Sequence, residues 1–281
     1  LVGSRLRPFL ELAAHLGMLR YEGGRFSLHE GDERFFDPAL DYGVGLPATP
    51  LQQLFATKGR AADILRGGAP VEVAASGGKS SIKDKSAFLR YMDSATQEPA
   101  RELAALIPAG VAGSIIDLGC GPGTYAYAAL ERFPEANAIL ADRPEAGLEI
   151  TAIAAERGLS DRVEFLPIDL TSQALPKGQD VAILSNVVHC LGATTNEELI
   201  ARIASALSPE GCLLIKDCAL AADRSGPPDT LRFGVSMVMF TEEGSIYSAE
   251  EVIGWCHSAG LHNTSIHAVE ADRNYVVIAR R

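Results

Sequence analysis

Apolar and polar residues form a repeating pattern along the second half of the chain. From position 114 onward, short apolar runs alternate with stretches in which apolar residues recur every three or four positions. Short runs of this kind are typical of buried strands, and the recurring stretches are typical of helices. The pattern predicts strands at 114–118, 138–141, 163–167, 181–185 and 213–216 and helices at 124–133, 146–156 and 196–207, with Thr195 as the cap of the last helix. Such alternation predicts a largely parallel sheet covered on both faces.

The end of the chain departs from this alternation. Two apolar stretches, 262–268 and 275–279, flank a polar segment at 270–274, and this arrangement predicts a hairpin. We therefore expect one edge strand to be antiparallel. The predicted fold class is a Rossmann-like, doubly wound α/β sheet that is mostly parallel and has an antiparallel C-terminal hairpin strand.

The first 85 residues are organised differently. Residues 7–19 carry an apolar stripe with helical spacing, and residues 21–28 form two short extended pieces around Gly23 and Gly24. A helix followed by such a hairpin suggests a winged-helix module. Residues 71–85 are small and polar and predict a linker, after which helical patterning runs from Ser86 to about Ile107. We predict two domains, 1–85 and 86–281.

Net charge differs between these two regions and limits their partners. Residues 1–85 contain 11 Lys and Arg against 10 Asp and Glu, whereas residues 86–281 contain 14 against 26. The acidic second region would repel a phosphate backbone, so we expect no nucleic-acid partner. The first region is nearly neutral, which favours a role in packing or dimerisation over DNA binding.

Composition is that of an ordinary globular protein, with 47% apolar and 22% charged residues. No apolar run approaches the roughly 18 residues that a membrane span requires. The chain starts at Leu1 and shows no signal-peptide pattern, so we expect a cytoplasmic protein whose natural chain begins earlier. Scattered cysteines without a CxxC pair predict reduced, buried thiols and not metal ligands; they are Cys120, Cys190, Cys212, Cys218 and Cys256.

The segment 115–124, IIDLGCGPGT, is the most informative about chemistry. A strand carrying Asp117 runs into a glycine-rich turn that opens a helix. Glycines allow a tight turn and let a ligand approach the backbone, and ligands bind at the carboxyl ends of the strands in such sheets. Asp142 ends the next strand, where its carboxylate would accept hydrogen bonds from both hydroxyls of a ribose. The sequence therefore predicts a site for a nucleotide-type cofactor.

Two features favour S-adenosylmethionine over a dinucleotide at this site. The glycine spacing is G-x-G-x-G, whereas NAD sites have G-x-G-x-x-G. Asp117 would repel a pyrophosphate, but it would attract the ammonium and sulfonium groups of S-adenosylmethionine. A dinucleotide site and a glycine turn without any ligand are the alternatives.

This motif resembles the glycine loop of the small-molecule O-methyltransferases typified by plant caffeic acid O-methyltransferase and its bacterial relatives, and the resemblance covers nearly the whole chain. The family's Asp-Leu-Pro motif matches Asp142-Arg143-Pro144, and its Asp-Met pair beside the adenine matches Asp169-Leu170. An upstream Phe-x-x-x-Met pattern, followed four positions later by a hydroxyl residue that holds the cofactor carboxylate, matches Phe88, Met92 and Thr96. The resemblance thus implies cofactor contacts from Thr96, Asp117, Gly119, Gly121, Asp142, Arg143, Asp169, Leu170 and Ser185, the last in place of a family lysine.

The resemblance also implies a catalytic base. The family has a His after the fourth strand, which matches His189, although the Asp-Trp that usually follows is Cys190-Leu191 here. A family carboxylate 28 residues further on matches Asp217. A second family acid falls on about Ile246, so one of the two acids that flank the base is absent. Relatives that methylate carbon with a bound metal use His-Asp and a second His; that Asp is missing here, so we predict no metal.

Elementary chemistry supports a base at this position. Methyl transfer is a displacement at a sulfonium, so the enzyme mainly aligns nucleophile, methyl and sulfur. A phenol with a pKa of about 10 is a poor nucleophile at neutral pH, and a positioned base accelerates the reaction roughly 10²–10⁴-fold. His189 suits this role because an unperturbed imidazole has a pKa of about 6.5, and a carboxylate at Asp217 would fix its tautomer.

The acceptor is expected to be a small molecule. In the family, a helix over the acceptor pocket corresponds to residues 231–240, so Phe233, Met237 and Phe240 join Phe88 and Met92 as expected pocket residues; core or dimer packing is the alternative. The family also implies a homodimer formed through the N-terminal winged-helix domain. The leading hypothesis is O-methylation of a small, aromatic hydroxyl compound. The others are C-methylation beside the ketone of a 2-oxo acid, a regulator that binds the cofactor without turnover, and NAD-dependent oxidoreduction.

Overall fold

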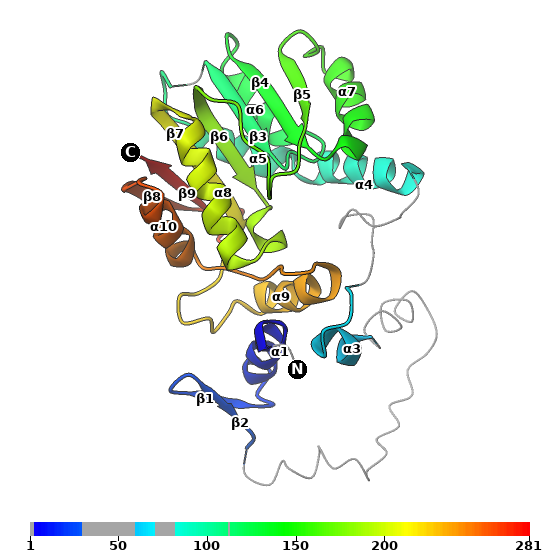
Figure 1. Ribbon diagram of the computed structural model, residues 1–281, viewed down its shortest axis with the longest axis vertical. Coiled ribbons are helices and arrows are strands. Elements are labelled where there is room, and N and C mark those ends of the chain that lie inside the picture. Colours follow the sequence, from blue (N-terminus) through cyan, green and yellow to red (C-terminus); the bar gives the residue numbers. More distant parts are fainter. Residues whose placement is uncertain (1–2, 30–59, 71–81, 112) are drawn as a thin grey trace.

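A seven-stranded sheet is the centre of the molecule (Figure 1). The computed structural model describes residues 3–29, 60–70, 82–111 and 113–281. The order of strands across the sheet is β5-β4-β3-β6-β7-β9-β8. In chain order they are β3 (Ser114–Leu118), β4 (Asn137–Asp142), β5 (Val163–Pro167), β6 (Gln179–Ser185), β7 (Leu207–Cys218), β8 (Asn263–Val269) and β9 (Asn274–Arg280).

The five strands from β5 to β7 are parallel, as predicted. The chain moves outward from β3 to β5 on one side and then returns to β6, on the other side of β3. The strand order therefore reverses between β3 and β6, and ligands bind at the carboxyl ends of the strands beside such a reversal. The glycine loop follows β3 at this point.

The predicted C-terminal hairpin and its antiparallel strand are confirmed, but this strand lies inside the sheet and not at its edge. The antiparallel strand β9 lies between β7 and β8, so the edge strand β8 runs in the same direction as β7. Burial is consistent with β9 lying inside the sheet and β8 at its edge. Residues 275–279 of β9 are all buried, whereas most residues of β8 are exposed or half-buried.

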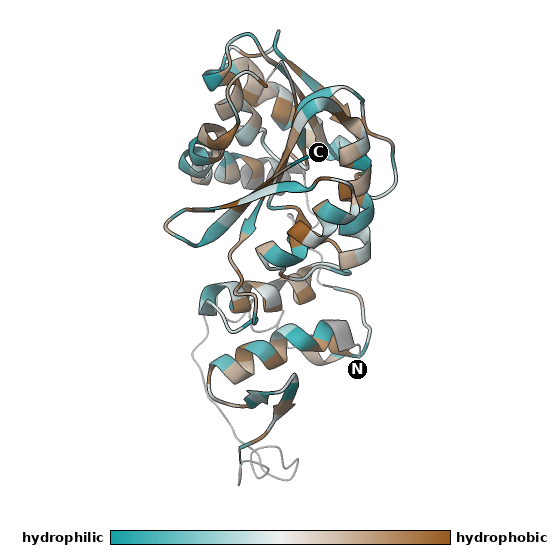
Figure 2. Ribbon diagram, turned by 90° about the vertical axis from the view of Figure 1, so that its left-hand side faces the viewer, coloured by the Kyte–Doolittle hydropathy of each residue, from teal (hydrophilic) through white to brown (hydrophobic). Residues whose placement is uncertain are grey.

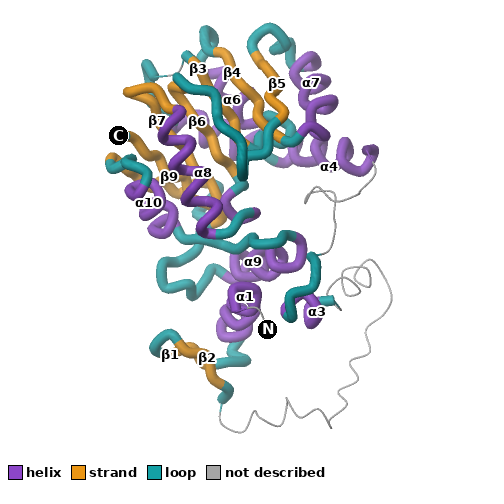
Figure 3. Tube along the Cα trace, in the orientation of Figure 1, coloured by secondary structure: helices purple, strands orange, loops and turns teal. Residues whose placement is uncertain are grey.

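Helices cover both faces of the sheet (Figure 3). One face packs against α5 (Gln97–Leu106), α6 (Thr124–Arg132) and α7 (Gly147–Glu156), and the other packs against α8 (Ala193–Ala206) and α10 (Ala249–Ser258). Alternate residues of β3 enter the two cores, with Ile115 in the first and Ile116 in the second. The predicted covering of both faces is therefore confirmed.

Helix boundaries differ from the predictions in three places. The expected single helix over 86–107 is two helices, α4 (Ile82–Ala95) and α5, which meet at Thr96. α8 begins after Gly192, so Thr195 lies inside its first turn and does not cap it. α10 was not predicted, although Ser248 and Glu251 form the S-x-x-E capping box that marks a helix start.

The N-terminal elements lie at one end of an elongated molecule (Figure 2). They are α1 (Gly3–His15), the paired strands β1 (Arg20–Glu22) and β2 (Arg25–Ser27), and α3 (Ala61–Leu65). The hairpin around Gly23 and Gly24 is confirmed. α1 and α3 pack against α9 (Pro228–Phe240), which belongs to the C-terminal half of the chain. The winged-helix assignment and the boundary at 85 stay predictions, and most of the predicted linker lies outside the described residues.

Arg224 connects α1 with the catalytic half of the chain. Its guanidinium pairs with Glu11 of α1 at 2.5 Å and with Glu251 of α10 at 3.1 Å. It also donates a hydrogen bond to the carbonyl oxygen of Ile246 at 3.2 Å. The Arg224 and Glu11 side chains are 10% and 4% exposed, so this junction excludes most solvent.

All five cysteines are free thiols, and four of them are at least partly buried, as expected. Cys190 is the exception, because it is exposed. It follows His189 in a short turn at the end of β6, where the chain leaves the core. Among the described helices, none is long and apolar enough to cross a membrane.

Candidate active site

The glycine loop between β3 and α6 has backbone conformations that only glycine adopts easily. Gly119 has φ +68°, and a Cβ at this position would lie 2.6 Å from Cγ2 of Val187. Gly123 has φ +89°, and a Cβ there would lie 2.8 Å from the ring of Tyr127. Both conformation and space therefore require glycine at these two positions.

Asp142 joins the end of β4 to this loop. Its carboxylate accepts hydrogen bonds from the backbone N–H of Gly121 and of Arg143, both at 2.7 Å. Burial raises the pKa of Asp142 above its ordinary value, and the two N–H donors oppose this shift. A carboxylate accepts about four hydrogen bonds, so lone pairs stay available for ribose hydroxyls. Space beside Gly121 is also open, since a Cβ there would meet only Leu89, at 4.0 Å.

Asp117 is not placed as we expected. Its carboxyl group is buried and accepts a hydrogen bond from the N–H of Ala126, in the first turn of α6, at 3.2 Å. Burial raises its pKa to about 7, against the opposing effect of that N–H. Asp117 therefore stabilises the start of α6 from inside the domain and does not present an exposed negative charge to a ligand.

Two other residues expected at the cofactor site already use their polar groups within the protein. The Thr96 hydroxyl donates to the carbonyl oxygen of Met92 at 2.7 Å, so it has no second hydrogen for a carboxylate. Asp169 accepts hydrogen bonds from the Thr171 N–H and hydroxyl and from the Ser172 hydroxyl, and these bonds keep its pKa below the ordinary value. Asp169 is exposed, so its free lone pairs are accessible.

The remaining expected cofactor residues lie around the strand ends. Leu170 is beside the loop, because its Cδ1 would be 3.6 Å from a Cβ on Gly119. Ser185 is buried at the end of β6, next to Asn186. Arg143 is exposed and follows β4. The sheet thus gathers residues that are distant in sequence at the carboxyl ends of β3, β4 and β6.

His189 and Asp217 meet in the structure as their spacing predicts. His189 lies in the turn η4 (Val188–Cys190) after β6, and Asp217 is near the end of β7. The imidazole Nδ1 is 2.8 Å from Oδ1 and 3.0 Å from Oδ2 of Asp217. The backbone N–H of His189 also donates to Oδ2, at 3.3 Å. Since Nδ1 faces the carboxylate, it carries a hydrogen, and Nε2 is the nitrogen that exchanges a proton with an acceptor.

The charges around His189 and Asp217 favour the protonated, positively charged form of the His189 imidazole. Burial lowers the pKa of His189, but the charge and hydrogen bonds of Asp217 raise it further than burial lowers it, to about 10. Burial raises the pKa of Asp217, and His189 outweighs that effect and keeps the pKa below its ordinary value. At neutral pH the pair is therefore an imidazolium beside a carboxylate.

Three residues that sequence reasoning missed hold the turn that carries His189. The Asn196 side chain donates to the carbonyl oxygens of Val188 at 2.8 Å and Leu191 at 3.3 Å. The Tyr247 hydroxyl donates to the carbonyl oxygen of Leu191 at 2.8 Å, and the Ser245 N–H donates to the carbonyl oxygen of His189 at 3.0 Å. The backbone partners of Tyr247 and Ser245 are distant in the chain, so no local pattern marks these two residues, whereas Asn196 bonds to backbone groups five and eight residues before it.

Phe233 is the expected pocket residue that contacts the base. Its ring meets the His189 imidazole edge to face, with centroids 4.8 Å apart and planes at 82°. Met237 is buried one turn further along α9, and Phe240 packs against the cluster that contains Ile64. Met92 is half-buried on α4; the side chain of Phe88 lies outside the described residues.

Ile246 occupies the position where the resemblance implied a second acid. It is 1% exposed and clusters with Leu220 and Leu231. Its Cδ1 would be 2.9 Å from a Cβ on Gly234, the residue after Phe233. An apolar side chain therefore fills this position behind Phe233, and Asp217 is the carboxylate that contacts the imidazole.

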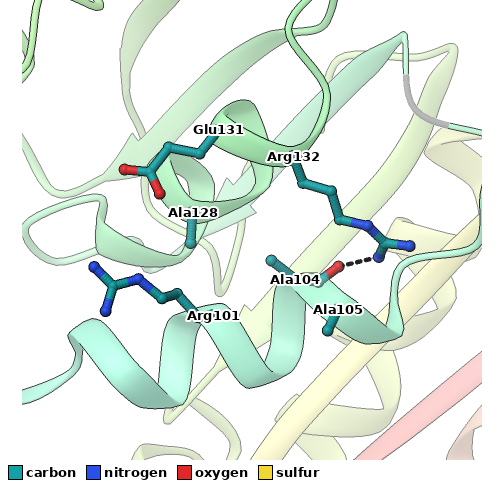
Figure 4. A pocket seen from close by; sticks show the side chains of 6 residues that line it. All are labelled: Arg101, Ala104, Ala105, Ala128, Glu131 and Arg132. Atoms are coloured by element: carbon teal, nitrogen blue, oxygen red, sulfur yellow. Dashed lines mark hydrogen bonds between the residues drawn. The ribbon is translucent and has the colours of Figure 1, made fainter.

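One hollow in the described part of the chain lies away from these residues. It measures about 390 Å³ and is an open depression between α5 and α6 (Figure 4), lined by Arg101, Ala104, Ala105, Ala128, Glu131 and Arg132. Neither His189 nor the glycine loop lines this hollow, so the candidate site is defined by the side-chain contacts described above. Across the described residues, no cluster of three or more His, Cys, Asp or Glu has the arrangement of a metal site; the absence of a metal stays a prediction.

Comparisons with known proteins bear on the family and on the fold. Residues 74–262 match the family model of an O-methyltransferase domain. The tetracenomycin polyketide synthesis 8-O-methyl transferase of Streptomyces glaucescens is 28% identical over 268 residues, covering 94% of this chain and 79% of the relative. A family 2 O-methyltransferase of Planctomyces limnophilus, solved with apigenin, superposes with a TM-score of 0.74 at 22% identity, covering 100% and 82% of the two chains. Human N-acetylserotonin methyltransferase, solved with S-adenosylmethionine, gives 0.70 at 20% identity, covering 98% and 82%.

Proposed function

The chain belongs to the O-methyltransferase family and is an S-adenosylmethionine-dependent methyltransferase, and on that premise we propose that it methylates a hydroxyl group of a small aromatic compound with His189 as the general base. The observation that carries this proposal is the contact of the buried His189 ring with both Asp217 and Phe233. A base beside an aromatic wall suits the removal of a proton from an aromatic hydroxyl.

The residues at the strand ends fit the cofactor. The Asp142 carboxylate keeps lone pairs for the ribose hydroxyls, the open side of Gly121 leaves room above the loop, and Leu170 offers an apolar surface for a base ring. Backbone N–H groups of the loop and the exposed Asp169 add polar partners. When bound, S-adenosylmethionine supplies an electrophilic methyl group on a sulfonium.

In the proposed reaction, one proton moves from the acceptor hydroxyl to Nε2 of His189, and Asp217 holds the other ring hydrogen on Nδ1. An acceptor that binds as a phenol transfers its hydroxyl proton to Nε2 of a neutral His189, while Asp217 keeps the hydrogen on Nδ1. An acceptor that binds as a phenolate meets the imidazolium, which donates a hydrogen bond from Nε2. Both routes give the same complex, in which Asp217 stabilises the positive ring. The oxygen anion would then take the methyl group from a bound cofactor, whose sulfur would keep the electron pair of the broken bond.

The acceptor class follows from the apolar wall and the relatives. Phe233 contacts the His189 ring, Ile246 packs in the same apolar cluster as Phe233, and Met237 is buried one turn further along α9. The matched relative from Streptomyces glaucescens acts in polyketide synthesis, which supports an aromatic secondary metabolite as the acceptor.

Methylation of carbon is the second candidate, and Ile246 is the observation that favours it. With an apolar residue in place of the second acid, the site stabilises a positive imidazolium with one carboxylate only. This departure from the family pattern would suit a carbon acceptor only if that acceptor enolises readily, as a 2-oxo acid does beside its ketone. A labelled methyl group followed by NMR distinguishes oxygen from carbon in the product.

We also propose that the protein forms a homodimer through its N-terminal elements. Three large apolar side chains are exposed at the end of α1 and in the hairpin, namely Leu16 (54%), Met18 (56%) and Tyr21 (43%). Exposed apolar groups gathered in this way are typical of interfaces. Light scattering should give twice the chain mass, and a monomer at micromolar concentration would refute this proposal.

Calorimetric titration tests the proposed activity. S-adenosylhomocysteine should bind and NAD should not; tight binding of NAD alone would refute the proposal. A His189→Ala variant should keep its affinity for S-adenosylhomocysteine and lose turnover, because His189 acts on the acceptor and not on the cofactor.

A further inference from the structure

α4 lies next to the glycine loop and contacts it. In Figure 1 this helix crosses below α7, at the end of the sheet domain where the strand ends lie. Its residue Leu89 is the first side chain that a Cβ on Gly121 would meet, at 4.0 Å. The position of α4 therefore decides how closely this side of the cofactor loop is covered.

Polar contacts attach this helix to α6 and α7. Asp93 of α4 is central among them: both of its oxygens accept hydrogen bonds from Arg157, at 2.8 and 2.9 Å, and Oδ1 also accepts one from the Thr124 hydroxyl at 2.7 Å. Thr124 is the first residue of α6, directly after Gly123. Arg157 follows the last turn of α7. We name Asp93, Thr124 and Arg157 the α4 junction.

Arg157 connects the α4 junction to the glycine loop by a second route. Its guanidinium lies over the ring of Tyr127, 5.0 Å from the centroid. The same ring fills the space beneath Gly123, where a Cβ would be only 2.8 Å away. Asp93 therefore contacts the loop's helix directly through Thr124 and supports the loop indirectly through Arg157 and Tyr127.

A second set of charges fixes the orientation of α4 along α7. Arg90 pairs with Glu156 at 2.8 Å and with Glu149, and the Ser86 hydroxyl donates to Glu149 at 2.5 Å. These side chains occupy both ends of α7, so α4 is held along its length. The Arg90 and Glu156 side chains are 45% and 57% exposed, whereas those of Arg157 and Asp93 are 24% and 20% exposed. The α4 junction is thus the less solvated and more strongly coupled contact.

We propose that Asp93 is a positioning residue of the cofactor site, which holds α4 against the glycine loop through Thr124 and Arg157. The inference rests on the proposed function, because it assumes that the loop binds the cofactor. With α4 in place, Leu89 covers Gly121 and the first turn of α6 is fixed. When the junction opens, the loop is competent for a smaller fraction of the time, and the apparent affinity falls in proportion to that fraction.

Affinity for S-adenosylhomocysteine, measured by calorimetry, tests the role of Asp93. The variant Asp93→Asn keeps the size of the side chain and removes its charge, and it should weaken binding about tenfold, which corresponds to about 1.4 kcal/mol. Asp93→Glu retains the carboxylate and should recover most of the affinity. Glu98→Gln is the matched control: it removes one negative charge from an exposed ion pair with Arg101 on the neighbouring helix, and it should bind as the wild type does.

Hydrogen exchange separates positioning from a general loss of stability. Exchange should be faster in α4 of Asp93→Asn, with unchanged exchange in β3 and β6, and Glu98→Gln should exchange as the wild type does. Wild-type affinity and wild-type exchange of α4 in Asp93→Asn would overturn the proposal. If the wild type itself does not bind S-adenosylhomocysteine, the proposed function fails instead.

Discussion

Replacing Asp217 with asparagine should remove most of the activity while leaving the fold and cofactor affinity intact. In the wild type, Nδ1 of His189 lies within 3.0 Å of both carboxylate oxygens. An asparagine offers one oxygen and one NH₂ group in the same space. If the NH₂ faces Nδ1, the ring hydrogen moves to Nε2, where the acceptor's proton has to go, and the base is blocked.

The magnitude follows from the pKa of His189. Asp217 and burial together place it at about 10, against about 6.5 for an unperturbed imidazole, and this difference corresponds to about 5 kcal/mol in favour of the imidazolium. Without the carboxylate, burial is the largest effect that remains and only smaller contributions from Cys190 oppose it, so the pKa should fall well below 10. Since Asp217 stabilises the imidazolium that stands beside the oxygen anion in the reactive complex, we expect kcat to fall by about 10²–10⁴-fold.

Two assays check this prediction. Transfer of a labelled methyl group gives kcat, and NMR titration of labelled histidine gives the pKa of His189 in wild type and Asp217→Asn. Asp223→Asn, which changes an exposed carboxylate in the loop after β7, is the matched control and should be indistinguishable from the wild type. An Asp217→Asn variant with wild-type kcat, or a wild-type His189 that titrates near 6.5, would refute the reasoning.

Four further predictions concern pH, the cofactor loop and the acceptor wall. With a phenol of pKa about 10, kcat/KM should rise about tenfold per pH unit between pH 7 and 9. Below pH 10 both the phenol and His189 are protonated, and one of these two protons must leave before the reaction. A pH-independent rate would contradict the assignment of His189 as the base. Asp142→Ala should weaken S-adenosylhomocysteine binding about 10–100-fold in calorimetry through the loss of charge-assisted hydrogen bonds, and unchanged binding would show that Asp142 does not contact the cofactor. Gly119→Ala should lower the free energy of unfolding by about 1–3 kcal/mol, from its positive φ and the 2.6 Å approach to Val187, as measured in urea; an unchanged midpoint would contradict the geometry. Phe233→Ala should raise the KM for the acceptor about 2–10-fold, from the loss of the edge-to-face contact, with unchanged cofactor affinity as its control.

The sequence was sufficient to predict structural features that come from a repeating pattern or from residues adjacent in the chain. Apolar runs separated by helical stretches predict the parallel sheet, and the glycine motif predicts the turn between β3 and α6. The order of the C-terminal strands could also have been predicted, because the uninterrupted apolar run in β9 is typical of a strand with neighbours on both sides, whereas β8 alternates.

Features that depend on contacts between distant segments were not visible in the sequence. The spacing of His189 and Asp217 suggested their contact only through the family resemblance, since no local pattern places two strand ends side by side. Asp117 illustrates the limit: its position after a strand is the same whether the carboxyl group faces a ligand or, as here, the first turn of α6. The break between α4 and α5 at Thr96 and the contacts of Asn196 and Tyr247 likewise depend on tertiary packing.

A methyl-transfer assay tests the central claim most directly. It follows a labelled methyl group from S-adenosylmethionine to a panel of small hydroxyarenes, with wild type and His189→Ala measured side by side. The account predicts a product labelled on oxygen with the wild type, and loss of that product with His189→Ala at unchanged affinity for S-adenosylhomocysteine. Continued transfer by His189→Ala, or label found on carbon, would contradict it.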